Sequence, residues 1–573
     1  MTIYNQSPRL EKIQGHFQRL YGDAADRCLE RFEMLVGRYG VDSVDRAANA
    51  SRDQREIVLI TYGNSVQSDD EKPLETLRHF LVQYLKGAVS TVHLLPFFPS
   101  SSDDGFSVTD YHRVDENLGD WQDIRAIGKN FDLMFDLVLN HVSRKSAWFK
   151  DYVSGVAPAK RYFLELDPST DLSAVSRPRS QPLLTPTSTR DGETHVWTTF
   201  SADQIDLNFA NPDVLFEILD VLLFYITNGA RIVRLDAIAY LWKRVGTSCV
   251  HLEETHTVVK LIRDVVEFLA PGVLVLTETN VSHDENVSYF GTGDEASLVY
   301  QFSLPPLLLH ALQTEKIGYL RNWLTSLREP PPGCAFLNFT ASHDGIGLRP
   351  LAGVIPESEF ELVLQNAQER GGYLSMKRNS DGTESPYELN ITYFDALSDP
   401  DEWGSPLHIR RFLCSQTVAL ELQGIPAVYL HSLTATRNDY DGVNRTGRRR
   451  SVNRKAWSRS QLETLLADPT SVCFQVFNEY LRRLQIRTGH PAFHPQAKQR
   501  VPHVGEHVLA VERTSPDGNE TVLCLNNFSA QSQEVNLPEA SFEERPVDLL
   551  RQDGRIKTRT VVLEPYESCW LTG

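Results

Sequence analysis

The sequence lacks any long apolar run. No segment approaches the roughly 18 consecutive apolar residues that a membrane-spanning helix needs. The N-terminus, residues 1–7, also lacks the basic segment followed by an apolar one that is typical of a secretory signal. These absences argue against a membrane partner, and we expect a cytoplasmic protein.

Positive charge is in deficit. Lysine and arginine number 57 against 75 aspartates and glutamates, which gives a formal net charge of −18. A surface this acidic repels nucleic acid and anionic membranes, so neither is an expected partner. Small-molecule substrates remain, for a protein that we expect to be a monomer or a homodimer.

Cysteine pairs and cofactor motifs are missing as well. The seven cysteines are widely spaced, odd in number and include no CxxC pair, which is typical of reduced, buried thiols. There is no glycine-rich dinucleotide fingerprint and no cluster of metal-ligand residues. We therefore expect no cofactor and no metal site, calcium included.

The apolar segments that are present are short and regularly spaced. The chain has 573 residues, of which 41% are hydrophobic and 23% charged, as in ordinary globular proteins. Helical patterns separate eight short apolar runs, which predicts a (β/α)8 barrel of the α/β class. The expected strands lie at 57–62, 92–96, 133–141, 231–236, 273–278, 297–300, 335–339 and 427–430, and three clear helices at 74–85, 212–227 and 255–268.

Three other regions depart from the barrel rhythm. The first residues have a helical pattern, a proline-rich stretch follows the third strand, and hairpin signals dominate after about residue 490. We predict a barrel with an N-terminal helical extension, an inserted subdomain after strand 3 and a C-terminal β-sandwich. The expected bounds are 1–55 for the extension, 56–142 and 198–490 for the barrel, 143–197 for the insertion and 491–573 for the β-domain.

Three carboxylates stand where short apolar runs end: Asp236, Glu278 and Asp344. Strand ends converge on one catalytic face of a (β/α)8 barrel, so these side chains are expected to meet. Each one alone could be an ordinary strand-end ion pair. Their order and spacing together favour glycosyl transfer.

The chemistry assigns each carboxylate a role. Retaining enzymes use a nucleophile and an acid/base about 5–5.5 Å apart and pass through a covalent glycosyl-enzyme. Asp236 is the expected nucleophile, because Arg234 precedes it by two residues, points to the same side and keeps it ionised. Glu278 is the expected acid/base, with a raised pKa, and Asp344 the residue that grips two sugar hydroxyls. The histidines expected to donate hydrogen bonds to the same sugar are His141 and His343.

This arrangement resembles the α-amylase superfamily, glycoside hydrolase family 13. The matching segments are Asp136–His141, Arg234–Ala237, Glu278 and His343–Asp344. The resemblance implies the same three roles, with Asp344 as transition-state stabiliser.

A narrower resemblance is to the sucrose phosphorylase subfamily. It is carried by His93–Phe98, Asp103–Phe106, Gly246–Cys249, Ser303–His310, His343–Gly347 and Val452–Arg454. It implies that inorganic phosphate, a co-substrate, attacks the glucosyl-enzyme and releases α-D-glucose 1-phosphate. The glucose-subsite residues that it implies are Asp103, His141, Arg234, His343 and Arg450, with Phe200 as an aromatic wall.

The resemblance also implies residues on the other side of the bond that breaks. Arg179 looks like a mobile-loop arginine that meets phosphate, for which guanidinium geometry is suited, although it could be a solvated loop residue. Tyr240 and Tyr387 resemble acceptor-side aromatics.

The acceptor is less determined. Glu388 stands where sucrose phosphorylases usually have glutamine; it only accepts hydrogen bonds, so it favours hydroxyls and repels an anion. The run Arg448–Arg450 favours a carboxylate or phosphate instead, or is a solvated basic loop. Segments resembling the glucosylglycerate branch are Trp197–Phe200, Asp203–Asp206, His251–Glu253 and Arg437–Tyr440, but the loop at 441–450 differs.

Weighing these features with the acidic surface, which suggests salt adaptation, we expect 2-O-α-D-glucosylglycerol as the substrate. The alternatives are glucosylglycerate, then sucrose 6′-phosphate and sucrose. A hydrolase or transglucosidase would share the carboxylates without needing the phosphate-side arginine. A non-catalytic barrel would usually lack the carboxylates and carry a membrane span.

Overall fold

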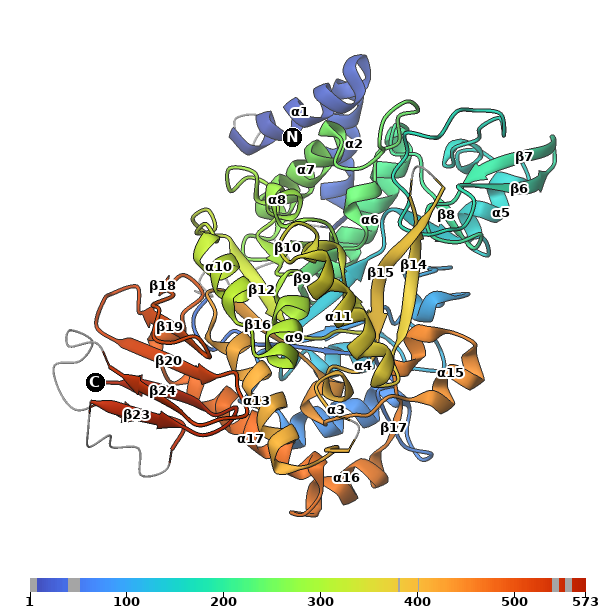
Figure 1. The fold of residues 1–573 in the computed structure, drawn as a ribbon. Coiled ribbons are helices and arrows are strands. Elements are labelled where there is room, and N and C mark those ends of the chain that lie inside the picture. The colour runs from blue at the N-terminus through green and yellow to red at the C-terminus, as the bar shows by residue number, and fades with distance from the viewer. Residues whose placement is uncertain (1–7, 40–51, 380–381, 400, 538–545, 552–558) are drawn as a thin grey trace.

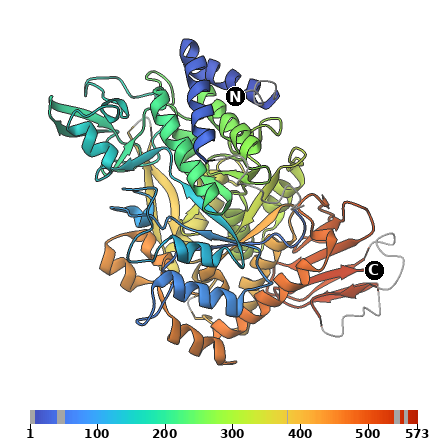
Figure 2. The same cartoon turned by 180° about the vertical axis from the view of Figure 1, so that it is seen from behind.

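The structure, a computed structural model, describes residues 8–39, 52–379, 382–399, 401–537, 546–551 and 559–573. A central barrel carries the N-terminal helices and the C-terminal sheets on different sides (Figures 1 and 2). Within the described ranges, no helix is both long and apolar enough to span a membrane.

The barrel consists of eight parallel strands in chain order, and the last pairs with the first. The strands are β1 (Val58–Thr61), β3 (Thr91–Leu94), β4 (Asp132–Leu137), β9 (Ala230–Leu235), β10 (Leu274–Thr277), β11 (Leu298–Tyr300), β12 (Ala335–Phe339) and β16 (Ile425–Tyr429). The three expected helices are α3 (Pro73–Tyr84), α6 (Pro212–Thr227) and α7 (Glu253–Leu269). The predicted fold class is confirmed.

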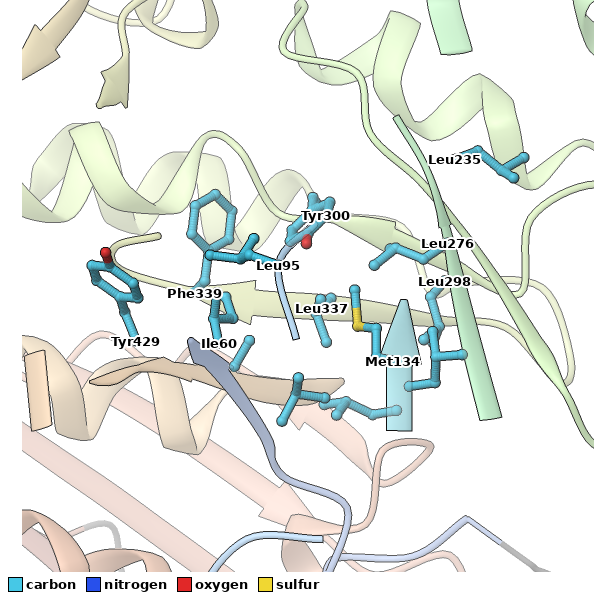
Figure 3. Close-up of a cluster of buried hydrophobic side chains, with 14 of the residues drawn as sticks. Ile60, Leu95, Met134, Leu235, Leu276, Leu298, Tyr300, Leu337, Phe339 and Tyr429 are labelled. Atoms are coloured by element: carbon cyan, nitrogen blue, oxygen red, sulfur yellow. The ribbon is translucent and has the colours of Figure 1, made fainter. Parts of the chain in front are cut away.

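Apolar side chains fill the inside of the barrel. Figure 3 shows Ile60, Met134, Leu276, Leu298 and Leu337, from five different strands, and each is at most 1% exposed. Strands that are buried on both faces need apolar residues throughout, which is why the sequence shows runs and not alternation. The polar residues of a site are therefore expected at or near the strand ends.

The segment between β4 and α6 forms a small β-rich subdomain. Its elements are β5 (His141–Ser143), α5 (Ala147–Val153), β6 (Leu184–Thr189), β7 (Gly192–Trp197) and β8 (Gln204–Asp206). Because β5 pairs antiparallel with β8, hydrogen bonding within this segment continues past residue 197, where the sequence analysis ends the insertion.

A second excursion leaves the barrel between β12 and helix α13 (Pro406–Glu421). It contains β13 (Ile346–Gly347), α11 (Glu357–Glu369), β14 (Tyr373–Arg378) and β15 (Glu384–Asn390), with strand order β13–β15–β14. The sequence analysis assigned this stretch to the barrel. Its hairpin was missed because β14 is half-buried to exposed and lacks an apolar run. Figure 1 shows β14 and β15 extending beside the inserted subdomain.

The N-terminal extension is helical and packed. It forms α1 (Pro8–Tyr21) and α2 (Ala25–Tyr39), joined by a short 3₁₀ turn. Phe17 is fully buried, and its ring stacks on Phe216 of α6 at 5.8 Å. His16 and Asp264 of α7 form a buried hydrogen bond at 2.8 Å. The expected continuation of helix to residue 50 lies outside the described residues.

The C-terminal region forms two antiparallel sheets. One contains β18 (Lys498–Arg500), β19 (Val508–Thr514), β20 (Thr521–Asn527), β22 (Val547–Asp548) and β24 (Ser568–Thr572), and the other β21 (Gln533–Asn536) and β23 (Thr560–Leu563). Apolar residues of both sheets share one buried cluster, as expected of a sandwich. All seven cysteines are free and buried, which confirms the expected thiols.

Candidate active site

One cavity at the carboxyl ends of the strands gathers most of the predicted site residues. Asp236, Glu278 and Asp344 follow β9, β10 and β12, and their side chains are 10%, 16% and 28% exposed, enough to meet a ligand. The other predicted residues that line this cavity are Asp103, His141, Arg179, Phe200, His343, Tyr387, Glu388 and Arg450. Arg234 is buried beside Asp236, and Tyr240 lines an adjoining pocket.

Asp236 is held by a buried arginine. Arg234 Nη1 donates a hydrogen bond to Asp236 Oδ1 at 2.7 Å and also pairs with Asp136. His93 Nε2 lies 2.7 Å from Asp136 Oδ2, which completes a buried row of charged and polar groups. The expected Arg234–Asp236 pair is therefore present.

Glu278 lies farther than Asp236 from the positive charge of Arg234. Its Oε2 accepts a hydrogen bond from the Ala237 N–H at 2.9 Å and lies 4.0 Å from Arg234 Nη2. Burial raises the pKa of both Asp236 and Glu278 to about 7. Because Arg234 contacts Asp236 directly, the first proton bound by this pair goes to Glu278. The geometry thus favours an ionised Asp236 beside a protonated Glu278.

Asp344 belongs to a second ion-pair group. Arg450 Nη1 lies 2.7 Å from Asp344 Oδ1, while its Nη2 and Nε donate to Glu388 at 2.6 and 3.0 Å. Burial opposes the charge on Asp344, but Arg450 and the neighbouring cations outweigh it and hold the pKa of Asp344 well below its usual range. This carboxylate is therefore ionised at neutral pH.

The charge of Glu388 is compensated. Its side chain is 1% exposed, binds Arg450 in a two-pronged pair and accepts the Gly345 N–H at 2.8 Å. The expectation that Glu388 repels an anionic acceptor is therefore weakened, because Arg450, which it shares with Asp344, offsets part of its charge.

The other two arginines of the run are also engaged. Arg448 Nη1 lies 2.8 Å from Asp104 Oδ1, and Arg449 donates to the Leu374 carbonyl of β14. Neither lines the catalytic cavity. Arg448 and Arg449 therefore fasten their loop to neighbouring segments, and the geometry gives these two residues no role in binding an anionic acceptor.

Several residues that line the catalytic cavity were not predicted from the sequence. Phe106 stacks on His343 with ring centroids 4.9 Å apart, and Gln204 Nε2 lies 3.2 Å from Asp103 Oδ2 and 3.1 Å from His141 Nε2. Both stood inside motifs already noted, so position within those motifs was the available signal. Asp103 has a φ of 54°, an uncommon value for a residue other than glycine, and such conformations cluster at functional sites.

The closed barrel and the carboxylates at its strand ends define the class: a (β/α)8 enzyme of glycosyl transfer. Residues 81–328 match the family model "Alpha amylase, catalytic domain", and residues 500–570 match "Maltogenic Amylase, C-terminal domain". The chain is 42% identical to the glucosylglycerate phosphorylase of Escherichia coli (strain K12), covering 98% of this chain and 100% of the relative.

Two further comparisons agree. The chain is 46% identical to the glucosylglycerate phosphorylase of Spirochaeta thermophila, over 91% of this chain and 90% of the relative. The crystal structure of sucrose 6F-phosphate phosphorylase from Thermoanaerobacter thermosaccharolyticum superposes with a TM-score of 0.73 at 25% identity, covering 84% and 96% of the two chains. The chain belongs to the α-amylase superfamily, glycoside hydrolase family 13, in its sucrose phosphorylase-like group, and is a glycosyltransferase-type phosphorylase.

The expected preference for glucosylglycerol is less well supported than its alternative. The glucosylglycerol phosphorylase of Marinobacter adhaerens is 29% identical, over 76% of this chain and 88% of the relative. The glucosylglycerate phosphorylases are far more similar, so the comparisons favour the alternative acceptor.

Proposed function

We propose that this enzyme phosphorolyses glucosylglycerate reversibly, giving α-D-glucose 1-phosphate and glycerate. The 42–46% identity to glucosylglycerate phosphorylases over nearly the whole chain carries the proposal. The pairing of Glu388 with Arg450 adds support, because it weakens the main objection to an anionic acceptor.

In the first step, a carboxylate oxygen of Asp236 attacks the anomeric carbon of the glucosyl unit. The bond from that carbon to the acceptor oxygen breaks, and Glu278 gives its proton to this oxygen, so glycerate leaves with a hydroxyl group. The pairing of Arg234 with Asp236 supports these roles, since an ionised nucleophile and a protonated acid must coexist.

In the second step, an oxygen of inorganic phosphate attacks the same carbon. The bond to Asp236 breaks, and the Glu278 carboxylate takes the proton from the attacking phosphate. Two inversions leave the anomeric configuration unchanged. Arg179 would bind the phosphate; its place in the cavity lining, with its guanidinium 5.5 Å from the centroid of the Tyr387 ring, supports this role. No cofactor takes part in this scheme.

Asp344 and the residues around it would hold the glucose ring. A carboxylate that remains ionised can accept hydrogen bonds from two neighbouring sugar hydroxyls, and these bonds strengthen as the ring distorts. Phe106, Phe200 and the two histidines would form the apolar and polar walls of the same subsite.

The test is release of glucose 1-phosphate from glucosylglycerate, glucosylglycerol, sucrose and sucrose 6′-phosphate, each with inorganic phosphate. We expect the highest kcat/KM with glucosylglycerate. A higher value with another glucoside would overturn the acceptor. Free glucose in place of glucose 1-phosphate would instead indicate a hydrolase.

The covalent intermediate has a separate test. Labelled phosphate should exchange into glucose 1-phosphate in the absence of any acceptor, because the glucosyl-enzyme forms and reverses without one. Exchange that requires added glycerate would contradict the two-step scheme.

A further inference from the structure

A second pocket adjoins the catalytic cavity and is lined by cations. Two excursions from the barrel form it: the loop of residues 172–178 from the inserted subdomain, and the segment at the end of β14. We name it the outer basic pocket; its charged residues are Arg177, Arg349, Lys377 and Arg378, and its aromatic walls are Tyr240 and Tyr387. Among the residues that the structure describes, none that lines this pocket is acidic.

The positive charges of this pocket are poorly compensated. Arg349 Nη2 lies 3.6 Å from Glu285 Oε2, but among the described residues no carboxylate forms an ion pair with Arg177, Lys377 or Arg378. Burial, together with the charge of Arg349, lowers the pKa of the Lys377 ammonium. Burial and the charge of Arg378 likewise lower the pKa of Arg177. Cations that repel one another in a half-buried pocket favour binding of an anion.

The pocket lies on the side of the acid/base. Tyr387 lines both the catalytic cavity and the outer basic pocket. Tyr240 packs edge-on against Phe200 with ring centroids 5.4 Å apart, and burial, aided by the charge of Glu278, raises its pKa to about 12. The leaving group must sit beside the acid that protonates it. A cation of the outer basic pocket that contacts the acceptor must therefore reach past these tyrosines toward Glu278.

We propose that the outer basic pocket binds the carboxylate of the acceptor, with Lys377 and Arg349 as its direct partners. This inference rests on the proposed function and adds to it a specificity subsite where the outer basic pocket adjoins the catalytic cavity at Tyr387. Arg177 and Arg378 raise the local potential. An uncharged acceptor such as glycerol gains nothing from these cations, so the pocket discriminates in favour of an anionic acceptor.

The variant that tests the subsite is Lys377→Met, which removes the charge and keeps an unbranched side chain. Lys129→Met is the matched control, since Lys129 is exposed in the turn before β4, at the opposite end of the barrel. Lys377→Arg is the conservative variant. Three reactions are measured for each: phosphorolysis of glucosylglycerate, phosphorolysis of glucosylglycerol, and phosphate exchange into glucose 1-phosphate.

For Lys377→Met we expect kcat/KM with glucosylglycerate to fall by about tenfold to a hundredfold, the size of a lost hydrogen bond to a charged group. Glucosylglycerol phosphorolysis and phosphate exchange should stay within about twofold of the wild type, which also shows that the variant folds. Lys377→Arg should recover most of the loss, and Lys129→Met should show none. Raising the ionic strength should weaken binding of glucosylglycerate more than that of glucosylglycerol.

Other outcomes overturn the inference. Equal losses with both glucosides would mean that Lys377 supports the fold. A raised phosphate KM in the exchange reaction would assign the pocket to inorganic phosphate.

A different set of results would refute the proposed acceptor and not the subsite. Wild-type enzyme that exchanges phosphate but does not phosphorolyse glucosylglycerate would refute the acceptor alone. Free glycerate and other small hydroxy acids would then be compared as inhibitors of exchange. Stronger inhibition of the wild type than of Lys377→Met would uphold the carboxylate subsite, and equal inhibition would overturn it.

Discussion

The two adjoining pockets treat charge in opposite ways. Around the catalytic carboxylates the cations are paired: Arg234 pairs with Asp136 and Asp236, and Arg450 pairs with Asp344 and Glu388. In the outer basic pocket, among the residues that the structure describes, only Arg349 has a carboxylate partner. A neutral glucosyl ring needs fixed hydrogen-bonding groups that do not reorganise, which paired charges provide. An anionic acceptor needs net positive charge, which only unpaired cations provide.

The largest effect in the catalytic cavity is expected from Asp236→Asn. The substitution keeps the shape of the side chain but removes both the nucleophile and the partner of Arg234, so we expect kcat to fall by about 10⁴-fold or more. Both phosphorolysis and phosphate exchange should be lost together. A variant that retained wild-type exchange would remove Asp236 from the chemistry.

The pH dependence tests the shared proton of Asp236 and Glu278. Glu278 acts as an acid only when protonated, and its pKa is raised to about 7, so this form is lost as the pH rises through 7. We expect kcat/KM for the glucoside to fall about tenfold per pH unit on that side. It should fall again at lower pH, as Asp236 takes up the second proton. The quantity to measure is kcat/KM for the glucoside, because in a two-step scheme it does not depend on the ionisation of phosphate.

α-Glucosyl fluoride provides the control for that profile. Fluoride leaves without a proton, so the alkaline fall should vanish while the acidic fall remains. An unchanged alkaline fall would assign it to a group other than Glu278.

Weakening the ion pairs of Arg450 should have a smaller effect on kcat. Glu388→Gln removes one of the two carboxylates that hold Arg450 but keeps an oxygen for the Gly345 N–H. We expect about a tenfold loss of kcat for both glucosides, because Arg450 then shifts relative to Asp344. Glu361→Gln, at an exposed position of helix α11 in the same excursion, is the control and should have no effect. A loss confined to glucosylglycerate would mean that Glu388 instead contacts the acceptor.

The smallest effect is expected at the arginine run. Arg448→Gln removes a half-exposed pair with Asp104, and such pairs contribute about 0–1 kcal/mol. The ratio of kcat/KM values for glucosylglycerate and glucosylglycerol should change by less than about twofold. A larger shift in that ratio would show that this run, and not the outer basic pocket, selects the acceptor.

The features that could be predicted from the sequence are those that depend on residues close together in the chain. Eight buried strands appear as eight apolar runs, and a charge at the end of such a run, as in Asp236 or Glu278, has no packing role. What could not be predicted is pairing across the chain. Glu388 meets Arg450 at a separation of 62 residues, and Arg448 meets Asp104 at 344, so neither charge could be classed as free or compensated beforehand. The outer basic pocket was hidden for the same reason, since Arg177 and Lys377 come from separate excursions.

The β14–β15 hairpin links these observations. Glu388 on β15 holds Arg450, which contacts Asp344 in the catalytic cavity. Lys377 on β14 lines the outer basic pocket. Neither residue belongs to a barrel strand. On the role proposed for Lys377, changes in β14 would alter the choice of acceptor while the eight strands and their carboxylates stay as they are. Acceptor specificity would then differ among related enzymes mainly through the sequence of this hairpin. Replacing the hairpin by that of a relative would be a direct way to change the acceptor.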